Sequence, residues 1–128
     1  MNLKSDGNSS CTKPLENVVR LLGRQWTIPL IMILGECENT IRYSEVRENL
    51  TKESTDAISD STLSRKLSEL TNLGVVSRKS YDEVPPRVEY GLTDAGTTLF
   101  HTLHQMAEWT RKQCHNGMLR IPRKNAID

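Results

Sequence analysis

The chain has 128 residues, a mass of 14.5 kDa and a formal net charge of +1 at pH 7. This length gives one domain with a single core and excludes two complete domains. No apolar run approaches the roughly 20 residues that a membrane-spanning helix needs, and the N-terminus lacks the pattern of a secretion signal, so we expect a cytoplasmic protein. Basic residues are in excess toward both ends and acidic residues in the middle. Any binding of nucleic acid must therefore depend on particular cations rather than on bulk charge.

The first third of the chain predicts two helices. Residues 1–10 are polar and predict a flexible start. Apolar residues at helical spacing follow Pro14, which suits a first helical position, and we expect Gly23 to end this helix as a left-handed cap. Residues 26–34 are apolar on nearly every face, which predicts a helix in the centre of the fold with Pro29 in its first turn.

The middle of the chain predicts a short strand and two further helices. Residues 40–43 favour a strand, and residues 44–50 favour a helix. Polar residues 51–58 read as an extended loop. Ser59 then begins a helix that Gly74 ends, with Leu63, Leu67, Leu70 and Leu73 on one face and polar residues on the other.

The last third predicts a β-hairpin and a long helix. Residues 75–81 and 87–92 are strand-like, and the prolines between them belong at a hairpin tip because proline has no amide hydrogen for a ladder. Thr93 caps a helix whose apolar face holds Leu99, Leu103, Met106 and Trp109, with Phe100 and Ala107 beside them. This helix is too long for so small a domain to cover, so we expect part of the face to meet a second copy of the chain.

This order of elements is that of a winged helix-turn-helix, and the chain resembles the HxlR-type winged-helix transcriptional regulators, relatives of the MarR group, over about residues 11–109. The resemblance rests on Cys11 before the first helix, "LLGRQW", "RYSEVRENL", "LSRKLSELTNLGVVSR" and above all "EVPPRVEYGLTDAG" at residues 83–96. It implies a mainly α (α+β) fold with a two-stranded β-hairpin wing and a long C-terminal dimerisation helix. The expected divisions are a flexible N-terminus at 1–10, the winged domain at 11–116 and a basic tail at 117–128. Residues 51–58 are longer than the turn usual in the family, and Thr12 replaces its usual proline.

The resemblance implies a homodimeric, sequence-specific regulator of transcription, with repression favoured, that binds double-stranded DNA. The recognition helix, about 59–73, would enter the major groove, and the wing, about 75–92, would lie on the minor groove or the backbone. We expect Arg65 to read guanine, Lys66 to contact a phosphate and Arg87 at the tip to touch DNA, with nearby acidic residues facing away or pairing with Arg87. The candidate DNA-binding residues are Ser61, Thr62, Ser64, Arg65, Lys66, Ser68, Arg78, Lys79, Arg87 and Ser44.

Several of these residues also have simpler interpretations. Ser44 would serve equally as a helix cap. The two prolines would serve equally to protect a sheet edge from pairing. The basic tail, with Arg120, Arg123 and Lys124, would either follow DNA beside the site or remain a solvated end.

The dimer interface is expected on the first and last helices, at Leu15, Val18, Val19, Leu103, Met106 and Trp109. Cys11 lies just before a helix N-terminus and near Lys13, which favours a thiolate. In some members of the family the matching cysteine senses oxidants, so Cys11 is a candidate redox sensor, and an idle thiol is the alternative. Three cysteines at wide spacing do not form a disulfide framework, and Cys37 reads as structural.

Other classes of function find little support. His101 and His104 share a helix face but lack further ligands, so no metal site and no cofactor are predicted. Cys114 and His115 are adjacent and point apart on a helix, and no phosphate-binding glycine motif occurs, so no catalytic residue is predicted. The remaining alternative is a winged-helix module for protein–protein contact without specific DNA binding, which the acidic middle of the chain would suit. A small-molecule or oxidant effector stays unidentified.

Overall fold

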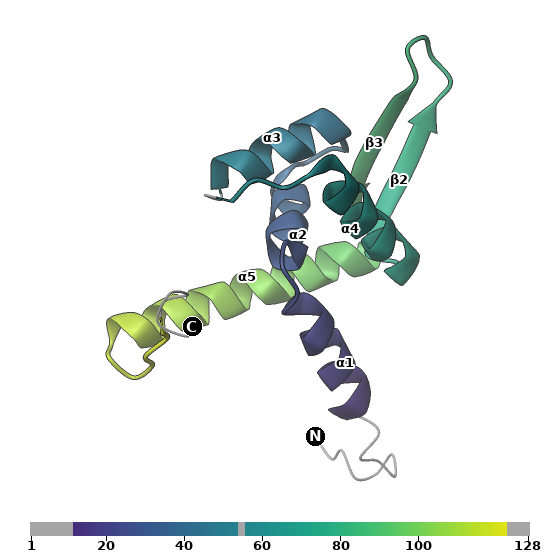
Figure 1. The fold of residues 1–128 in the computed structure, drawn as a ribbon. Coiled ribbons are helices and arrows are strands. Elements are labelled where there is room, and N and C mark those ends of the chain that lie inside the picture. Colours follow the sequence, from purple (N-terminus) through teal and green to yellow (C-terminus); the bar gives the residue numbers. More distant parts are fainter. Residues whose placement is uncertain (1–11, 54–55, 123–128) are drawn as a thin grey trace.

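The protein is described from a computed structural model, in which residues 12–53 and 56–122 are placed. The elements of this part follow one another along the chain as Figure 1 shows. They are α1 (Thr12–Leu22), α2 (Thr27–Glu36), β1 (Ile41–Arg42), α3 (Tyr43–Glu53), α4 (Asp60–Leu73), β2 (Val76–Tyr81), β3 (Arg87–Leu92) and α5 (Asp94–His115). The predicted mainly α winged helix-turn-helix order is confirmed.

Helix α2 lies in the centre of the core, as its apolar sequence predicts. Leu30 and Ile31 are completely buried, and α3, α4, the sheet and α5 each add apolar side chains to the same cluster. Pro29 stands in the first turn of α2, where it costs no helical hydrogen bond. The helices around α2 are therefore positioned by what they bury against it.

The junction between α1 and α2 differs from the prediction. Gly23 does not take the left-handed conformation, and its amide instead donates to the Val19 carbonyl at 3.0 Å. The left-handed residue is Trp26, with φ of 75°, which begins α2 without a side-chain cap. The indole of Trp26 is buried, and this burial offsets a backbone conformation that bulky residues rarely adopt. The turn bends α1 away from α2 by 88°.

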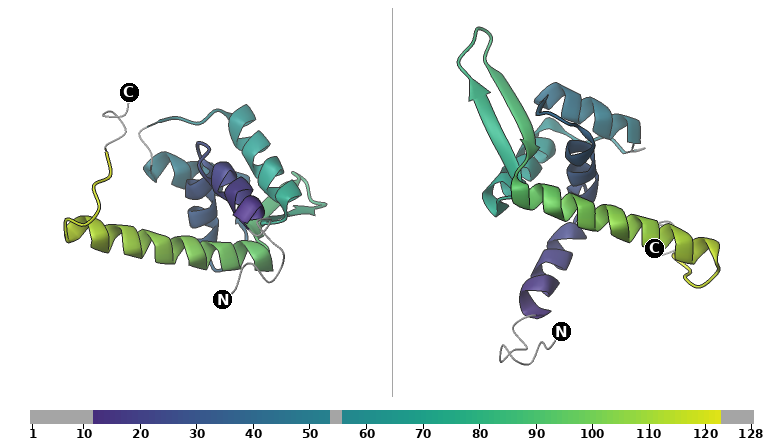
Figure 2. Two further views of the ribbon diagram at one scale, coloured as in Figure 1. Left: turned by 90° about the horizontal axis from the view of Figure 1, so that it is seen from below. Right: turned by 180° about the vertical axis from the view of Figure 1, so that it is seen from behind.

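The sheet has three antiparallel strands in the order β1-β3-β2. The predicted hairpin is confirmed, with Val76 opposite Leu92 and Tyr81 opposite Arg87, and the Val84–Pro85 peptide bond at its tip is cis. Strand β1 pairs on the other side of β3, with Arg42 opposite Glu89. The hairpin projects from the body of the molecule, as Figures 1 and 2 show.

The predicted caps around α4 and α5 are confirmed. The Ser59 hydroxyl accepts from the Thr62 amide, and Gly74 ends α4 in the left-handed conformation. Thr93 caps α5 by accepting from the Gly96 amide at 3.0 Å, and it donates to the Gly74 carbonyl at 2.6 Å. Through this one side chain, the end of α4 and the start of α5 are joined.

Two details of the helix-turn-helix differ from the prediction. Helix α3 continues to Glu53, so residues 51–53 belong to it rather than to the expected loop, and the Thr51 hydroxyl bonds back to the Arg47 carbonyl at 2.9 Å. Leu73 was expected on the buried face of α4, but its position in the last turn leaves it about half exposed.

Helix α5 crosses α2 at close range and then runs beyond the body of the molecule, as the two views of Figure 2 show. A Cβ atom on Gly35 would lie 2.1 Å from Cδ1 of Phe100, so only glycine fits at this crossing.

Within the described ranges no single helix is long and apolar enough to cross a membrane, although α1 and α2 together, bent as they are, have that length and composition.

Candidate nucleic-acid interface

Helix α4 begins at a cluster of hydroxyl groups. The Ser59 hydroxyl accepts from the Thr62 amide at 3.2 Å, donates to the Thr62 hydroxyl at 2.9 Å and lies 3.2 Å from the Ser61 hydroxyl. Ser61 and Thr62, two of the predicted DNA-binding residues, therefore have hydroxyl groups that already take part in the helix cap. This cap fixes the first turn of α4.

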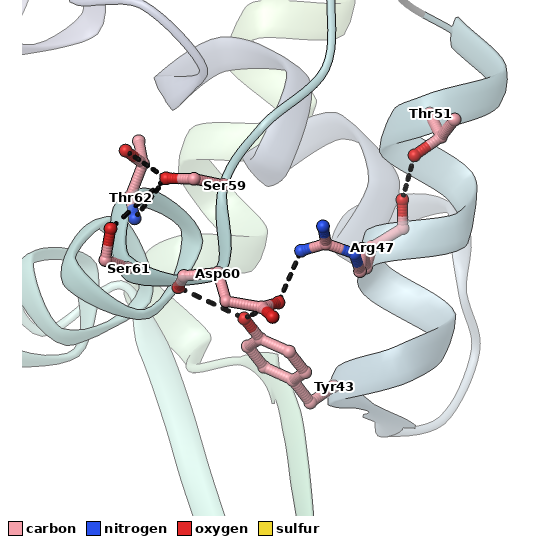
Figure 3. A network of polar contacts seen from close by, with 7 residues as sticks. All are labelled: Tyr43, Arg47, Thr51, Ser59, Asp60, Ser61 and Thr62. Atoms are coloured by element: carbon pink, nitrogen blue, oxygen red, sulfur yellow. Dashed lines mark hydrogen bonds and ion pairs between the residues drawn. The ribbon is translucent and has the colours of Figure 1, made fainter.

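A second set of contacts joins the start of α4 to α3. The Asp60 carboxylate forms an ion pair with Arg47 and lies 3.0 Å from the Tyr43 hydroxyl, which is also 3.2 Å from the Asp60 carbonyl. Figure 3 shows these side chains converging between the two helices. The Asp60 side chain is 75% exposed, so the ion pair contributes at most about 1 kcal/mol. The ion pair and the Tyr43 contacts link the start of α4 to α3.

The outward face of α4 carries short polar residues around one arginine. Ser64, Arg65 and Ser68 are exposed, while Leu63 and Leu67 on the opposite face are buried. Within residues 12–53 and 56–122, no ion pair or hydrogen bond engages the Arg65 side chain. Arg65 thus presents a guanidinium group to the surroundings, with small neighbours that allow close approach.

Lys66 is placed differently from the expectation. Its side chain is only 10% exposed, and Nζ lies 3.6 Å from the Glu69 carboxylate. The helical period turns position 66 toward the core side, where its alkyl chain packs and its ammonium group is paired. This placement does not fit the expected phosphate contact, and Lys66 is left out of the interface proposed below.

Arg87 stands at the first position of β3 and is held on three sides. Its Nη2 atom lies 3.1 Å from the Glu83 carboxylate, its Nε atom lies 3.2 Å from the Glu89 carboxylate, and its guanidinium group stacks 4.0 Å from the centre of the Tyr81 ring. The side chain is 26% exposed. The acidic neighbour Glu83 therefore pairs with Arg87, which was one of the two arrangements expected.

Glu89 ties this cluster to β1. A hydrogen bond from the Thr40 hydroxyl lowers the pKa of Glu89 most, and the positive charge of Arg87, a hydrogen bond from Tyr81 and the charge of Arg42 lower it further, against the opposing effect of burial. The carboxylate is thus held in its charged form by groups from both neighbouring strands.

Arg78 and Lys79 on β2 are exposed, and Arg78 donates to the Ser80 hydroxyl at 3.0 Å.

A groove of about 510 Å³ separates the hairpin tip from the start of α3. Its lining includes Arg42 and Ser44, together with Glu83, Pro85, Pro86 and Arg87 of the hairpin. Ser44 lies inside the first turn of α3, so the capping role considered for it belongs instead to Glu45, whose carboxylate accepts from the Arg42 amide at 3.0 Å. The Ser44 hydroxyl is exposed at the rim of this groove.

Helices α1 and α5 carry the apolar residues predicted for a dimer interface. Leu15, Val18 and Val19 are exposed on α1, and Met106 and Trp109 on α5 are each 56% exposed. Leu103 is instead buried beside Phe100 in the core of the chain itself, because it lies one turn closer to the point where α5 crosses α2. It does not fit the expected contact between two chains.

The thiol groups have distinct surroundings. Cys11 lies outside the described residues, as do Arg123 and Lys124 of the basic tail. Burial raises the pKa of the Cys37 thiol, and the carboxylates of Glu36 and Glu45 raise it further, so this thiol stays protonated at neutral pH. Cys114 is exposed.

In the part of the chain that is described, no three His, Cys, Asp or Glu side chains gather as metal ligands.

Sequence patterns did not identify Tyr43, Arg47 or Asp60 as a linked group. These residues are 13 and 17 positions apart, and such long-range pairs leave no periodic signal. Residues 42–44 are expected from the sequence to add phosphate contacts, and Arg42 lies at the start of this stretch. Its role in the groove depends on the pairing of β1 with β3, which the sequence did not predict.

Two helices linked by polar contacts, with a central helix and a β-hairpin beside them, define a winged helix-turn-helix protein. The chain belongs to the HxlR-like helix-turn-helix family, whose model matches residues 21–118. It is 37% identical over 103 residues, 80% of this chain and 86% of the relative, to the HTH-type transcriptional regulator BH0655 of Halalkalibacterium halodurans. This membership makes it a DNA-binding regulator of transcription rather than an enzyme.

Solved structures agree with this assignment. A MarR-family transcriptional regulator of Enterococcus faecalis V583 aligns with a TM-score of 0.73 and 27% identity, over 86% of this chain and 93% of that one. The redox regulator HypR in its oxidised form aligns with a TM-score of 0.64 and 32% identity, over 77% of this chain and 95% of that one.

The link between α3 and α4 predicts the effect of Tyr43→Phe, which removes one hydroxyl and no charge. We expect a loss of about 0.5–1.5 kcal/mol in the free energy of unfolding, measured with urea, because the Asp60 groups lose a hydrogen bond. DNA affinity, measured by fluorescence anisotropy, should fall below the wild-type value, by up to about tenfold, since that factor corresponds to 1.4 kcal/mol.

Tyr90→Phe is the matched control for this experiment, because the Tyr90 hydroxyl makes no hydrogen bond within the described residues. Its affinity for DNA should stay at the wild-type value. Equal DNA affinities for the Tyr43 and Tyr90 variants would show that the link does not orient α4.

Proposed function

We propose that the chain is a homodimeric repressor that recognises a roughly palindromic DNA site with two copies of α4. The observation that carries this proposal is the exposed Arg65, which has no ion pair or hydrogen bond to the described residues, on a helix whose opposite face is buried in the core. A helix held in this way has one face available for a major groove, and an arginine there has the geometry to bind both acceptors of a guanine.

Base recognition in this proposal depends mainly on Arg65. Ser64 and Ser68 beside it are short, so they allow the helix to approach the base edges and they discriminate weakly between bases. Ser61 and Thr62 lie at the N-terminal end, where recognition helices reach deepest into the groove. Their hydroxyl groups would contact DNA only while also serving the Ser59 cap.

Residues on either side of α4 would make the contacts to the DNA backbone. Arg78 and Lys79 on the wing are exposed cations, and Ser44 in the first turn of α3 adds a hydroxyl near the helix N-terminus, which attracts phosphate. Arg120 and the residues of the basic tail extend the same role to flanking DNA. These contacts position the protein and carry no sequence information.

Dimer formation is supported by the unpartnered apolar faces of α1 and α5. Helix α1 buries none of its residues in the chain itself, and Met106 and Trp109 extend the apolar surface along α5. A second copy that covers these faces would place the two α4 helices in successive major grooves, about 34 Å apart. Repression would result where such a dimer covers DNA that a polymerase needs.

A thiol response through Cys11 completes the proposal. It is supported by the position of this cysteine before α1 and by the likeness to a protein described as a redox regulator. Oxidation there would act on the helix expected at the dimer interface. A cytoplasmic location accords with reduced thiols and with a DNA partner.

The alternative of a protein-binding module without specific DNA contact is favoured only by the acidic middle of the chain. The dependence of binding on salt separates the two functions. Each phosphate contact in a DNA complex adds a slope of about 0.9 in the logarithm of affinity against the logarithm of salt.

Arg65→Ala tests the role of α4. We expect a loss of about 1–3 kcal/mol for a selected DNA site and a relaxed preference at one base pair of each half-site, because a guanine contact is lost. Selection from a random DNA library measures both effects. Arg111→Ala removes the same charge from α5, where Arg111 pairs with Glu108, and should leave the base preference unchanged. An unchanged preference in the Arg65 variant would contradict the proposed role.

Trp109→Glu tests the dimer. A charge in the middle of an apolar contact leaves a buried group unpaired, so we expect a monomer by sedimentation and DNA affinity at least tenfold weaker. Thr51→Glu adds the same side chain on α3 and should remain a dimer. A dimeric Trp109 variant, or a monomeric wild-type protein, would rule out the proposed interface.

A further inference from the structure

We propose that the groove between the wing tip and the start of α3 is a binding site for a DNA backbone phosphate, and that the phosphate takes the place of Glu83 on Arg87. In the free protein Arg87 is bound by two carboxylates, and in the complex one of these would be exchanged for a phosphodiester. The inference rests on the proposed DNA-binding function and assigns a ligand to a groove on the wing side of the interface.

Arg87 is incompletely satisfied where it stands. A guanidinium group has five N–H donors, and the ion pairs with Glu83 and Glu89 engage only part of them. The Nε atom is buried and lies near Glu89 without the geometry of a hydrogen bond. Because Arg87 also lines the groove, its remaining donors have a ligand-sized space beside them.

The two carboxylates differ in how firmly they are held. Glu89 is only 16% exposed and receives hydrogen bonds from Thr40 and Tyr81. Glu83 stands at the hairpin tip, is 47% exposed, and within the described residues its side chain has Arg87 as its single partner. An incoming anion would therefore displace Glu83, while Glu89 and the Tyr81 ring keep the guanidinium group in position.

The lining of the groove also includes a second cation and a hydroxyl group. Arg42 and Ser44 line this groove together with Arg87, and its volume of about 510 Å³ is open to the surroundings and larger than a phosphate group. Arginine binds phosphate oxygens in pairs, and a phosphodiester carries the same single charge as the carboxylate that it replaces. The charge of Arg87 is therefore balanced by an anion both before and after the exchange. The exchange costs only the ion pair between Arg87 and Glu83.

Glu83→Gln tests the exchange directly. The variant removes the competing charge at an exposed position, so we expect affinity for a fluorescein-labelled random-sequence duplex to rise about two- to fivefold, the range given by breaking an exposed ion pair. Asp82→Asn is the matched control, because it removes an equal charge one residue away that is not paired with Arg87. Its effect reports general repulsion of DNA and should be smaller.

The same two substitutions in an Arg87→Ala background complete the experiment. Without the arginine there is nothing to exchange, so Glu83→Gln should then raise affinity no more than Asp82→Asn does. Equal effects of the two substitutions in the wild-type background, or an advantage of Glu83→Gln that persists without Arg87, would overturn the exchange and leave DNA binding itself intact. A wild-type protein with no salt-dependent affinity for the duplex would overturn both.

Discussion

Burial of one face of α4 is the interaction on which the rest of the structure depends. Leu63, Leu67 and Leu70 are almost fully buried against the core that α2 organises, and each contributes about 1.5–3 kcal/mol. These side chains decide which face of α4 points outward and therefore which residues can meet DNA. The Asp60 contacts with α3 are weaker and exposed, so they adjust the orientation of a helix that the leucines already hold.

The middle of the chain is acidic, but the pairing of its charged side chains leaves several cations available to bind DNA. Asp60 pairs with Arg47 and Glu69 pairs with Lys66, while Glu83 and Glu89 share Arg87, so part of this negative charge is neutralised locally. Arg65 has no such partner on its face of α4, and Arg42 lies at the rim of the groove. The attraction for DNA therefore comes from a few unpaired cations at specific places rather than from an overall positive surface.

Much of this fold could be predicted from the sequence, because local rules determine it. The caps at Ser59, Gly74 and Thr93 need only neighbouring residues, and the hairpin follows from strand-like runs around two prolines. Features set by distant contacts escaped prediction. Trp26 takes a glycine-like backbone conformation to bury its indole, Lys66 turns inward to meet Glu69, and Arg87 is enclosed by residues from both strands of the wing. For the site, the sequence identified the exposed face of α4 but not the contacts that orient it.

Guanine methylation by dimethyl sulfate on a selected duplex shows whether α4 enters the major groove, since the reacting N7 atom lies in that groove. We expect protection of guanines in two major grooves about one helical turn apart, with the pattern weakened in each half-site when Arg65 is replaced by alanine. Bound protein that leaves every guanine N7 accessible, or that protects only adenine N3 in the minor groove, would contradict it.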